Sequence, residues 1–296
     1  MLFGTLEAGG TKMVLSVGNG QNELLEQTSM PTESPEKTIR AMIDWFRDKG
    51  IVSLGIGTFG PVDLNPASST YGWITKTPKP GWCNKPLLPQ MKDALGIPAL
   101  IDTDVNAAAL AEWQLGAAKG LNCCLYVTVG TGIGAGLVIE GRLAHGMVHP
   151  ELGHILLRQE PEDPAPDGFC PYHRGCLEGL AAGPAIEKRW GAKAQNLSRD
   201  HEAWKLEASY LAQMCMNAIC AYSPEKIILG GGVMQQRHLF PLIRQKTQEL
   251  LNGYIQAKEI MEDIDHYIVE PGLGTKSGAT GALLLARKAY AMADNN

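Results

Sequence analysis

Four potential metal ligands occur between residues 149 and 178. Cys170, His173 and Cys176 are separated by two residues each, and His154 precedes them across a Pro-, Asp- and Gly-rich stretch. Two thiolates and an imidazole at this spacing can surround one cation, and a second imidazole would complete a tetrahedral set. Sulfur and nitrogen in fourfold geometry favour Zn²⁺. The ligands alone do not distinguish a zinc finger from a catalytic or a structural zinc site.

A second group of polar residues follows the short apolar segment 99–101, which predicts a strand. Asp102, Asp104 and Asn106 come after it, and a helix is expected to begin at Asn106. Residues between a strand and a helix lie where α/β folds place ligand-binding groups. Capping of the helix N-terminus would explain one of the acids, and Asp102 suits that role. Asp104 is therefore the better catalytic candidate.

Glycine-rich turns occur twice between predicted strands, at residues 7–12 and 130–136. Glycine lets the backbone approach a ligand and leaves its N–H groups open to an anion. Two such hairpins could bind a polyphosphate from two sides. An ordinary hairpin with a glycine bulge is the alternative for the first turn taken alone. The flanking strands are expected at 3–6 and 13–17, and at 123–129 and 137–139.

Three consecutive glycines, Gly230, Gly231 and Gly232, follow a predicted strand at 225–229. They permit close approach of a flat ring or a ribose, whereas a tight strand-to-helix turn would seldom need three. A nucleoside contact here, two phosphate hairpins and a carboxylate able to accept a hydroxyl proton together favour phosphoryl transfer. The residues thus predict an ATP-dependent kinase for a small hydroxylated substrate.

The repeated order of strand, glycine turn and strand indicates two related α/β halves. Further elements are expected from apolar periodicity and end signals. They comprise helices at 34–50, 206–222 and 277–290, strands at 51–57 and 266–270, and a proline-rich loop at 75–82.

Composition excludes several classes of protein. The chain has 296 residues, 45% hydrophobic and 19% charged, as in a soluble globular protein. A net charge of −5 argues against nucleic acid as the main partner, and apolar runs are too short to span a membrane. Seven scattered cysteines and an N-terminus without signal-peptide features predict a cytoplasmic protein with reduced thiols.

The motifs resemble those of the ROK family (repressors, open reading frames, kinases) from about residue 4 to residue 281, in the family's order. Residues 7–12 and 130–136 resemble its two phosphate motifs, and 230–233 its adenosine motif. Residues 104–108 resemble its catalytic segment, and 151–154 its sugar-and-zinc segment. The cysteine segment and the Glu-Ala-Gly-Gly-Thr-Lys turn are similar to those of the bacterial zinc-containing fructokinases.

This resemblance implies an α/β fold of two actin-like, ribonuclease-H-like domains, shared with hexokinases, with an ATP and sugar cleft between them. The first domain is expected at 1–116 and the second at 117–278, with a zinc-binding insertion at 149–178. The helix at 279–296 is expected to pack back on the first domain. The family also implies a homodimer, for which the apolar helix at 206–222 is one candidate interface.

The resemblance also implies phosphorylation of D-fructose to fructose 6-phosphate by Mg-ATP, with one structural zinc per chain. Asp104 would be the general base. Zinc would hold the strand that carries Glu151 against the sugar, and its removal would affect ATP binding little. Nucleotide contacts are expected from Gly9, Gly10, Thr11, Lys12, Gly130, Thr131, Gly132, Pro184, Gly230, Gly231, Gly232, Val233 and Met234. Sugar contacts are expected from Gly60, Pro61, Thr103, Asp104, Glu151 and His154, and zinc ligands are His154, Cys170, His173 and Cys176.

Three positions depart from the common family pattern: Glu7 replaces an aspartate, Thr103 an asparagine and His173 a cysteine. All three departures are similar to those of the fructokinase branch. A kinase for glucose, mannose, allose or N-acetylmannosamine is the main alternative. A ROK repressor is disfavoured because a strand begins at Phe3, where a helix-turn-helix domain would precede it. A bare zinc module would leave both glycine hairpins unexplained.

Overall fold

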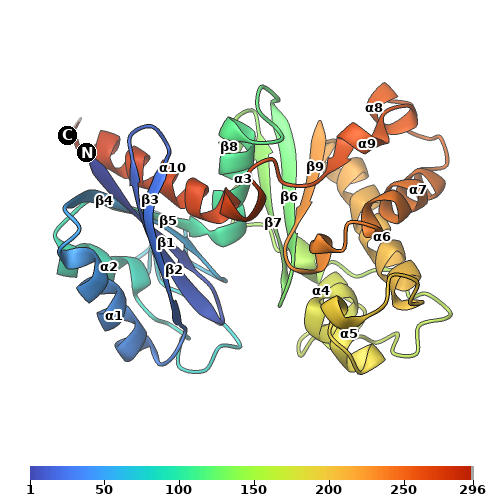
Figure 1. The fold of residues 1–296 in the computed structure, drawn as a ribbon, viewed down its shortest axis with the longest axis horizontal. Coiled ribbons are helices and arrows are strands. Elements are labelled where there is room, and N and C mark those ends of the chain that lie inside the picture. The colour runs from blue at the N-terminus through green and yellow to red at the C-terminus, as the bar shows by residue number, and fades with distance from the viewer. Residues whose placement is uncertain (295–296) are drawn as a thin grey trace. The chain divides into compact units, whose positions relative to one another are not determined.

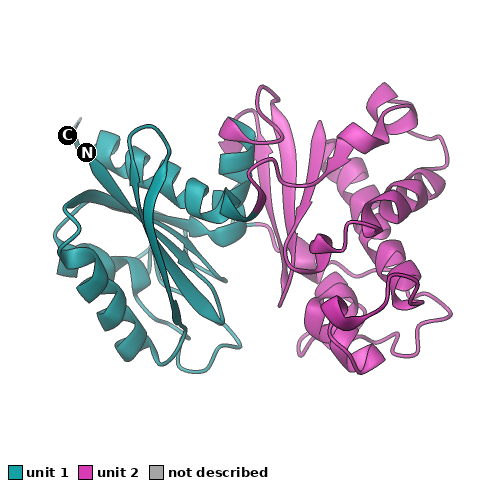
Figure 2. Ribbon diagram, viewed as in Figure 1, with its two compact units in different colours: residues 1–114, 143–149, 275–296 teal, residues 115–142, 150–274 magenta. Residues whose placement is uncertain are grey.

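The computed structural model describes residues 1–294, which divide into two compact units (Figure 2). The first contains residues 1–114, 143–149 and the described residues from 275 onward; the second contains 115–142 and 150–274. The expected boundary at 116 and 117 placed residues 143–149 in the second domain. They belong to the first unit, where His145 and His149 form hydrogen bonds.

The first unit is built on a five-stranded sheet of order β3-β2-β1-β4-β5 (Figure 1). β1 pairs antiparallel with β2, β2 pairs antiparallel with β3, and β4 lies parallel to both β1 and β5. The β1–β2 connection is the first glycine turn. The strands are β1 Leu2–Ala8, β2 Lys12–Asn19, β3 Leu24–Pro31, β4 Ile51–Thr58 and β5 Ala99–Thr103.

Helices cover both faces of this sheet because alternate strand residues point to opposite sides. Leu6 and Ile56 belong to the large core cluster that includes α1 (Pro35–Arg47) and α2 (Leu87–Leu95). Phe3 instead packs with Leu283 of α10 (Ser277–Asp294), and α3 (Asp104–Leu115) follows β5. Gly55 allows close approach of α10, because a Cβ there would lie 1.9 Å from the Ala282 carbonyl oxygen.

The second unit repeats this pattern with a sheet of order β10-β9-β6-β7-β8. Its central strand β6 pairs antiparallel with β7 across the second glycine turn and parallel with β9, and β9 lies parallel to β10. The two sheets therefore share one topology, as the two related halves of the sequence predicted. The strands are β6 Cys123–Val129, β7 Ile133–Ile139, β8 Arg142–Leu143, β9 Lys226–Gly230 and β10 Ile268–Val269.

Helix α6 (Ala203–Tyr222) is the main core helix of the second unit and packs against α4 and α7. Most of its residues are buried within the chain, so its apolar character is explained without the dimer interface suggested by the sequence. None of the helices between residues 1 and 294 is long and apolar enough to cross a membrane. The other helices are α4 Leu177–Ala181, α5 Gly183–Trp190, α7 Leu239–Leu251, α8 Lys258–Met261 and α9 Ile264–Tyr267, with short 3-10 turns at 152–154, 194–196, 233–235 and 274–276.

Several element boundaries differ from the sequence-based expectations. Helix α3 begins at Asp104 rather than Asn106, because Thr103 caps it. β7 begins at Ile133, so the second glycine turn is only 130–132. The strand expected at 266–270 is reduced to two residues after the short helix α9, and Glu151 precedes a 3-10 turn rather than lying in a strand.

Candidate active site and metal centre

The first glycine turn is a tight loop closed by its own backbone. The Gly9 N–H donates to the Lys12 carbonyl oxygen at 3.0 Å, and the Thr32 hydroxyl donates to the Gly9 carbonyl oxygen at 2.7 Å. A side chain at Gly9 would overlap the Lys12 oxygen, whereas one at Gly10 would meet nothing within 4 Å. Gly10 therefore leaves backbone open beside the turn, as a phosphate contact requires.

Glu7 immediately precedes this turn and is largely buried. Burial raises the pKa of its carboxyl group, and the positive charge of Lys12 opposes that shift. A Cβ at Gly278, in the first turn of α10, would lie 2.8 Å from the Glu7 carboxyl carbon. The carboxyl group that replaces the family's shorter aspartate therefore packs against the beginning of α10.

Asp104 occupies the first position of α3, directly after β5. The Val105 N–H donates to Asp104 Oδ1 at 2.9 Å, and the residue is half-buried. The positive end of a helix dipole stabilises a carboxylate at this position. Thr103 supplies the helix cap, since its Oγ1 accepts the Asn106 N–H at 3.0 Å. Asp102 is not the cap suggested by the sequence.

Asp102 instead lies at the centre of a buried polar cluster. Its Oδ1 accepts the Asn106 side-chain amide at 2.7 Å and the Thr103 N–H at 2.8 Å. Its Oδ2 lies 2.9 Å from His145 Nε2, and this hydrogen bond raises the pKa of His145 against the effect of burial. The Asp102 charge also raises the pKa of Tyr71, after the larger effect of burial. Asp102 therefore supports the turn that carries Asp104.

The Gly60–Pro61 turn leaves the end of the neighbouring strand β4 and contains a cis peptide bond. The Val62 N–H donates to His149 Nε2 at 3.2 Å. The Pro61 carbonyl oxygen accepts the Thr75 N–H at 2.8 Å. Because Thr58 of β4 pairs with Thr103 of β5, this turn and the Asp104 turn leave the same edge of the sheet. The first unit thus brings its predicted sugar contacts to one edge.

The second glycine turn is held by two neighbouring segments of the second unit. The Gly183 N–H donates to the Gly130 carbonyl oxygen at 2.8 Å, and Pro184 follows at the start of α5. The Ile133 N–H donates to Glu178 Oε2 at 2.9 Å, and a Cβ at Gly132 would lie 2.6 Å from that oxygen. The turn is therefore fixed on both sides.

The triple glycine lies beside the second glycine turn. Gly231 has a φ of +91°, and a Cβ there would lie 2.4 Å from the Val129 carbonyl oxygen. A Cβ at Gly130 would lie 3.9 Å from the Gly232 nitrogen, while one at Gly232 would meet nothing within 4 Å. The structure thus brings together the phosphate and nucleoside contacts predicted for the second unit. Val233 and Met234 begin the 3-10 turn that follows and are buried.

The carboxyl groups of Glu151 and Glu178 interact electrostatically in the second unit. Burial raises the pKa of Glu151 to about 7, and the negative charge of Glu178 adds to the effect. A Glu with this environment is typical of functional sites. Glu178 was not among the predicted contacts, although its position two residues after the ligand Cys176 could have indicated it. Its side chain contacts the second glycine turn, and its charge acts on Glu151.

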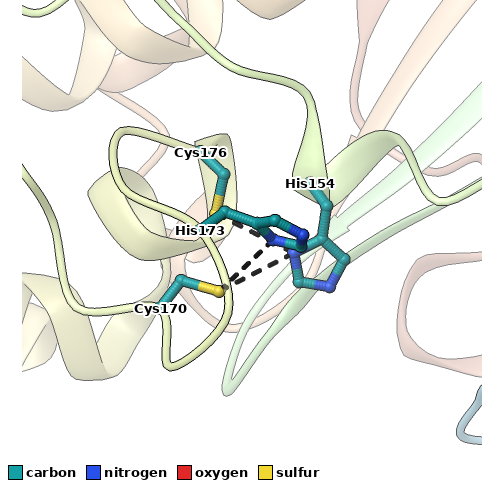
Figure 3. Close-up of side chains that lie close together, drawn as sticks. All are labelled: His154, Cys170, His173 and Cys176. Atoms are coloured by element: carbon teal, nitrogen blue, oxygen red, sulfur yellow. Dashed lines mark hydrogen bonds between the residues drawn. The ribbon is translucent and has the colours of Figure 1, made fainter.

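The four predicted metal ligands converge in the second unit (Figure 3). Their ligand atoms all lie within 4.8 Å of one another. Cys170 Sγ lies 3.9 Å from His154 Nδ1 and 3.7 Å from His173 Nδ1, and Cys176 Sγ lies 3.8 Å from His154 Nδ1. Ligands on a tetrahedral zinc ion are separated by about 3.5 Å from sulfur to nitrogen. The donor set and its spacing fit Zn²⁺.

Backbone contacts hold the two halves of this metal centre together. The Leu157 N–H donates to the Gly175 carbonyl oxygen, and the Leu177 N–H donates to that of Ile155. Burial raises the pKa of Cys176 to about 11, although its sulfur accepts the Gly179 N–H at 3.4 Å. A bound divalent cation would favour the thiolate. The ligand pair His154 and Cys176 is thus prearranged by short antiparallel pairing.

Comparison with known proteins agrees with this architecture. The ROK family profile matches residues 3–289. The chain is 45% identical to a fructokinase of Pediococcus pentosaceus, covering 98% of this chain and 99% of the relative. It is 42% identical to a fructokinase of Zymomonas mobilis, covering 96% of both chains.

Solved structures show the same relationship. The ROK hexokinase from Thermus thermophilus matches with a TM-score of 0.79 and 31% identity, covering 100% of both chains. A ROK glucokinase from Streptomyces griseus, solved with glucose and AMPPNP, matches with a TM-score of 0.78 and 23% identity, covering 97% of this chain and 100% of that one. These neighbours confirm the expected actin-like sugar-kinase fold. The chain belongs to the ROK family.

Proposed function

We propose that this protein transfers the γ-phosphoryl group of ATP to D-fructose and forms fructose 6-phosphate and ADP. The observation that carries the proposal is the position of Asp104, a half-buried carboxylate at the start of α3 on the same sheet edge as the Gly60–Pro61 turn. Fructose is chosen because relatives that are 40–45% identical over nearly their whole length are named fructokinases.

In this reaction Asp104 accepts the proton of the sugar's primary hydroxyl group. The freed oxygen attacks the γ-phosphorus, a P–O bond forms to the sugar, and the bond to the leaving ADP oxygen breaks. Phosphoryl transfer depends mainly on positioning and on neutralising the phosphate charge, which Mg²⁺ bound to the ATP supplies. Asp104 lies at the start of α3, where the positive end of the helix dipole favours a negative charge.

The nucleotide would be bound mainly by backbone groups of the glycine turns. Gly9–Lys12 in the first unit and Gly130–Gly132 in the second would contact phosphate, with the Lys12 ammonium adding positive charge. The adenosine would lie at Gly230–Met234 and Pro184. Support comes from Gly10 and Gly232, where a side chain would meet nothing within 4 Å and the backbone is open to a ligand.

The sugar would be contacted by Gly60, Pro61, Thr103 and Asp104 in the first unit and by Glu151 in the second. Thr103 uses its oxygen to cap α3, so its hydroxyl proton is the group available to a sugar oxygen. His154 Nδ1 faces the sulfur atoms of Cys170 and Cys176, which leaves Nε2 as the ring atom for a sugar hydroxyl. Glu178 joins this list because its charge acts on the Glu151 carboxyl group.

We further propose that His154, Cys170, His173 and Cys176 hold one zinc ion. Four protein ligands leave no open coordination position, and Asp104 supplies the base, so the zinc is structural. When bound, it would cross-link the 3-10 turn after Glu151 to the beginning of α4. Its role would be to position the glutamate side chains that contact the sugar rather than to polarise the substrate.

Asp104→Asn tests the assignment of the base. The amide keeps the size of the side chain but cannot accept the proton, so kcat should fall by about 10²–10⁴, the usual contribution of general base catalysis. The measurement is ADP release with a panel of hexoses, alongside circular dichroism to confirm folding. Near-normal turnover would remove Asp104 as the base.

The same panel tests the sugar. Wild-type enzyme should show its highest kcat/KM with fructose. A clear preference for glucose or mannose would contradict the fructose assignment. It would favour a hexokinase activity, as named for the 31% identical ROK protein of Thermus thermophilus. Glucose, mannose, allose and N-acetylmannosamine serve as the comparison sugars because all offer a primary hydroxyl group.

A further inference from the structure

Residues 143–149 form an excursion of the chain that belongs to the first unit, although the residues on either side belong to the second. Met147 is 97% exposed and Val148 is 60% exposed, so the middle of the excursion contributes no core packing. His145 and His149 form side-chain hydrogen bonds to the first unit. These two histidines hold the excursion in place.

The two histidines contact different segments of the first unit. His145 Nε2 lies 2.9 Å from Asp102 Oδ2 and 3.3 Å from the Asn106 amide nitrogen, at the turn that carries Asp104. His149 is 5% exposed, and its Nε2 accepts the Val62 N–H at 3.2 Å, at the turn that carries Pro61.

The Gly60–Val62 turn and the junction of β5 with α3 lie at the same edge of the sheet. β4 and β5 are adjacent and parallel, and Thr58 at the end of β4 pairs with Thr103 at the end of β5. Asp102 and Thr103 belong to this ladder, whereas the Gly60–Val62 turn lies beyond the end of β4 and is not held by it. His149 packs closely on the turn, since a Cβ at Gly60 would lie 3.2 Å from His149 Cε1. The excursion therefore connects the β5–α3 junction to a turn that the sheet itself does not hold.

We propose that His145 and His149 make residues 143–149 a clip that sets the spacing between the Gly60–Val62 turn and the β5–α3 junction (Asp102–Asn106), and thereby positions the sugar. This inference rests on the proposed function, because the turn and the junction carry the proposed sugar contacts of the first unit. The histidines are positioning residues: they act on the substrate through the segments they hold. The clip touches no proposed nucleotide contact, so its effect is specific to the sugar.

His145→Ala and His149→Ala each remove one hydrogen bond of the clip. Each should raise the KM for fructose roughly 3- to 10-fold, the range expected for one lost hydrogen bond, and leave the KM for ATP within about twofold. Steady-state kinetics with each substrate varied in turn gives this comparison, and titration calorimetry with fructose gives binding without turnover. An equal rise in both KM values would overturn the proposal.

Conservative variants separate positioning from general stability. Gln at position 145 can donate to Asp102, and Gln at position 149 can accept from Val62, so His145→Gln and His149→Gln should restore most of the fructose affinity. They also serve where an alanine variant does not fold, and failure of both to restore affinity would overturn the proposal. Met147→Ala is the matched control on the same excursion, and its fructose KM should stay unchanged.

A double-mutant cycle tests whether the two histidines act as one device. If both hydrogen bonds are needed to hold the clip, losing one already releases it. The fructose KM of the double alanine variant should then be little higher than that of a single variant. Changes that multiply would indicate independent anchors and would overturn the clip. A wild-type enzyme that prefers another hexose refutes the fructose assignment alone, and the cycle is then measured with that sugar. Failure to bind any hexose overturns both proposals.

Discussion

Glu151 is a proposed sugar contact whose carboxyl group has a raised pKa. Its pKa is raised to about 7, first by burial and then by the charge of Glu178. At pH 6 most of these groups are neutral, and at pH 8 most are ionised. A carboxylate accepts hydrogen bonds from sugar hydroxyl groups, whereas a carboxylic acid must also donate its own proton. Protonation of Glu151 should therefore weaken fructose binding.

We expect kcat/KM for fructose to rise with pH through about 7, because this ratio reports groups of the free enzyme. Glu178→Gln should move this rise to lower pH, since it removes the like charge but keeps an oxygen for the Ile133 N–H. Glu151→Gln should abolish the rise and lower the ratio at pH 8. The pH profiles of the three proteins provide the measurement. An unchanged midpoint in Glu178→Gln would contradict the electrostatic explanation.

Residue types and spacing predicted the clustering of His154, Cys170, His173 and Cys176, which the structure shows, because these residues lie in short motifs whose chemistry is local. The role of Asp104 as the base stays a prediction made on the same grounds. Glu178, His145 and His149 were not predicted. Their importance comes from partners far away in sequence: Ile133, Asp102 and Val62. A hydrogen bond across about forty or more residues leaves no periodic signal in the chain.

The triple glycine illustrates how one short element can combine folding and binding. Gly231 adopts a φ of +91° and approaches the Val129 carbonyl oxygen too closely for any side chain. Gly232 has an ordinary right-handed helical conformation and open space where a side chain would lie. Gly231 is therefore required by the fold, whereas the open space at Gly232 is explained by the proposed close approach of a nucleotide.

Gly231→Ala should lower the free energy of unfolding by about 1–3 kcal/mol, through backbone strain and overlap with Val129. Gly232→Ala is the matched control: it should unfold like the wild type but raise the KM for ATP, because its methyl group enters the proposed adenosine site. Thermal or urea unfolding and ATP-dependent kinetics distinguish the two. Equal stability losses at both positions would contradict this division.

At the scale of elements, the long periodic segments were predicted better than the short ones. The α1, β6 and α6 positions agree with expectation to within a few residues, because their apolar patterns are long. The beginning of α3 was misplaced by two residues because Thr103 supplies the cap, so that Asp104 and Val105 already belong to the helix. The strand expected at 266–270 failed because α9 occupies its first half.

The stretch of chain that leads to Cys170 is anchored to the second unit by contacts that involve no metal. Asp163 forms a bidentate ion pair with Arg189, at 2.8 and 3.0 Å, and accepts the Tyr210 hydroxyl at 2.6 Å. All of the Asp163 side chain is buried. This network holds the stretch between Glu160 and Ala165 against α5 and α6. Loss of zinc should therefore loosen residues 170–176 without unfolding the unit.

Zinc removal should nevertheless affect both substrates. Cys176 caps α4, and Glu178 of that helix accepts the Ile133 N–H at the second glycine turn. These contacts link the metal centre to the proposed phosphate site, so the sequence-based expectation that ATP binding would change little is replaced by the opposite prediction. Chelation should raise the KM for fructose and for ATP while the far-ultraviolet circular dichroism changes only slightly. Elemental analysis should first find about one zinc per chain. An ATP KM that is insensitive to chelation would contradict this link between the metal centre and the second glycine turn.

Across the whole molecule, the duplicated sheet topology was readable from the sequence because both glycine turns lie between strands in corresponding places. The assignment of residues 143–149 to the first unit was not, since it depends on contacts with residues far away in sequence, among them those of His145 and His149. Sequence thus predicted the repeated architecture, while the path of the chain between its two units depended on a few long-range polar contacts.

The packing of α10 on the first sheet has a consequence for synthesis on the ribosome. β1, β4 and β5 belong to the first part of the chain to emerge, yet α10 completes their second face. The Ser53 hydroxyl donates to the Ala286 carbonyl oxygen, and Gly55 contacts the same helix closely. Residues 115–274 need no later segment to complete their unit. The unit made second should therefore finish folding first, and the first sheet would need protection from aggregation until translation ends.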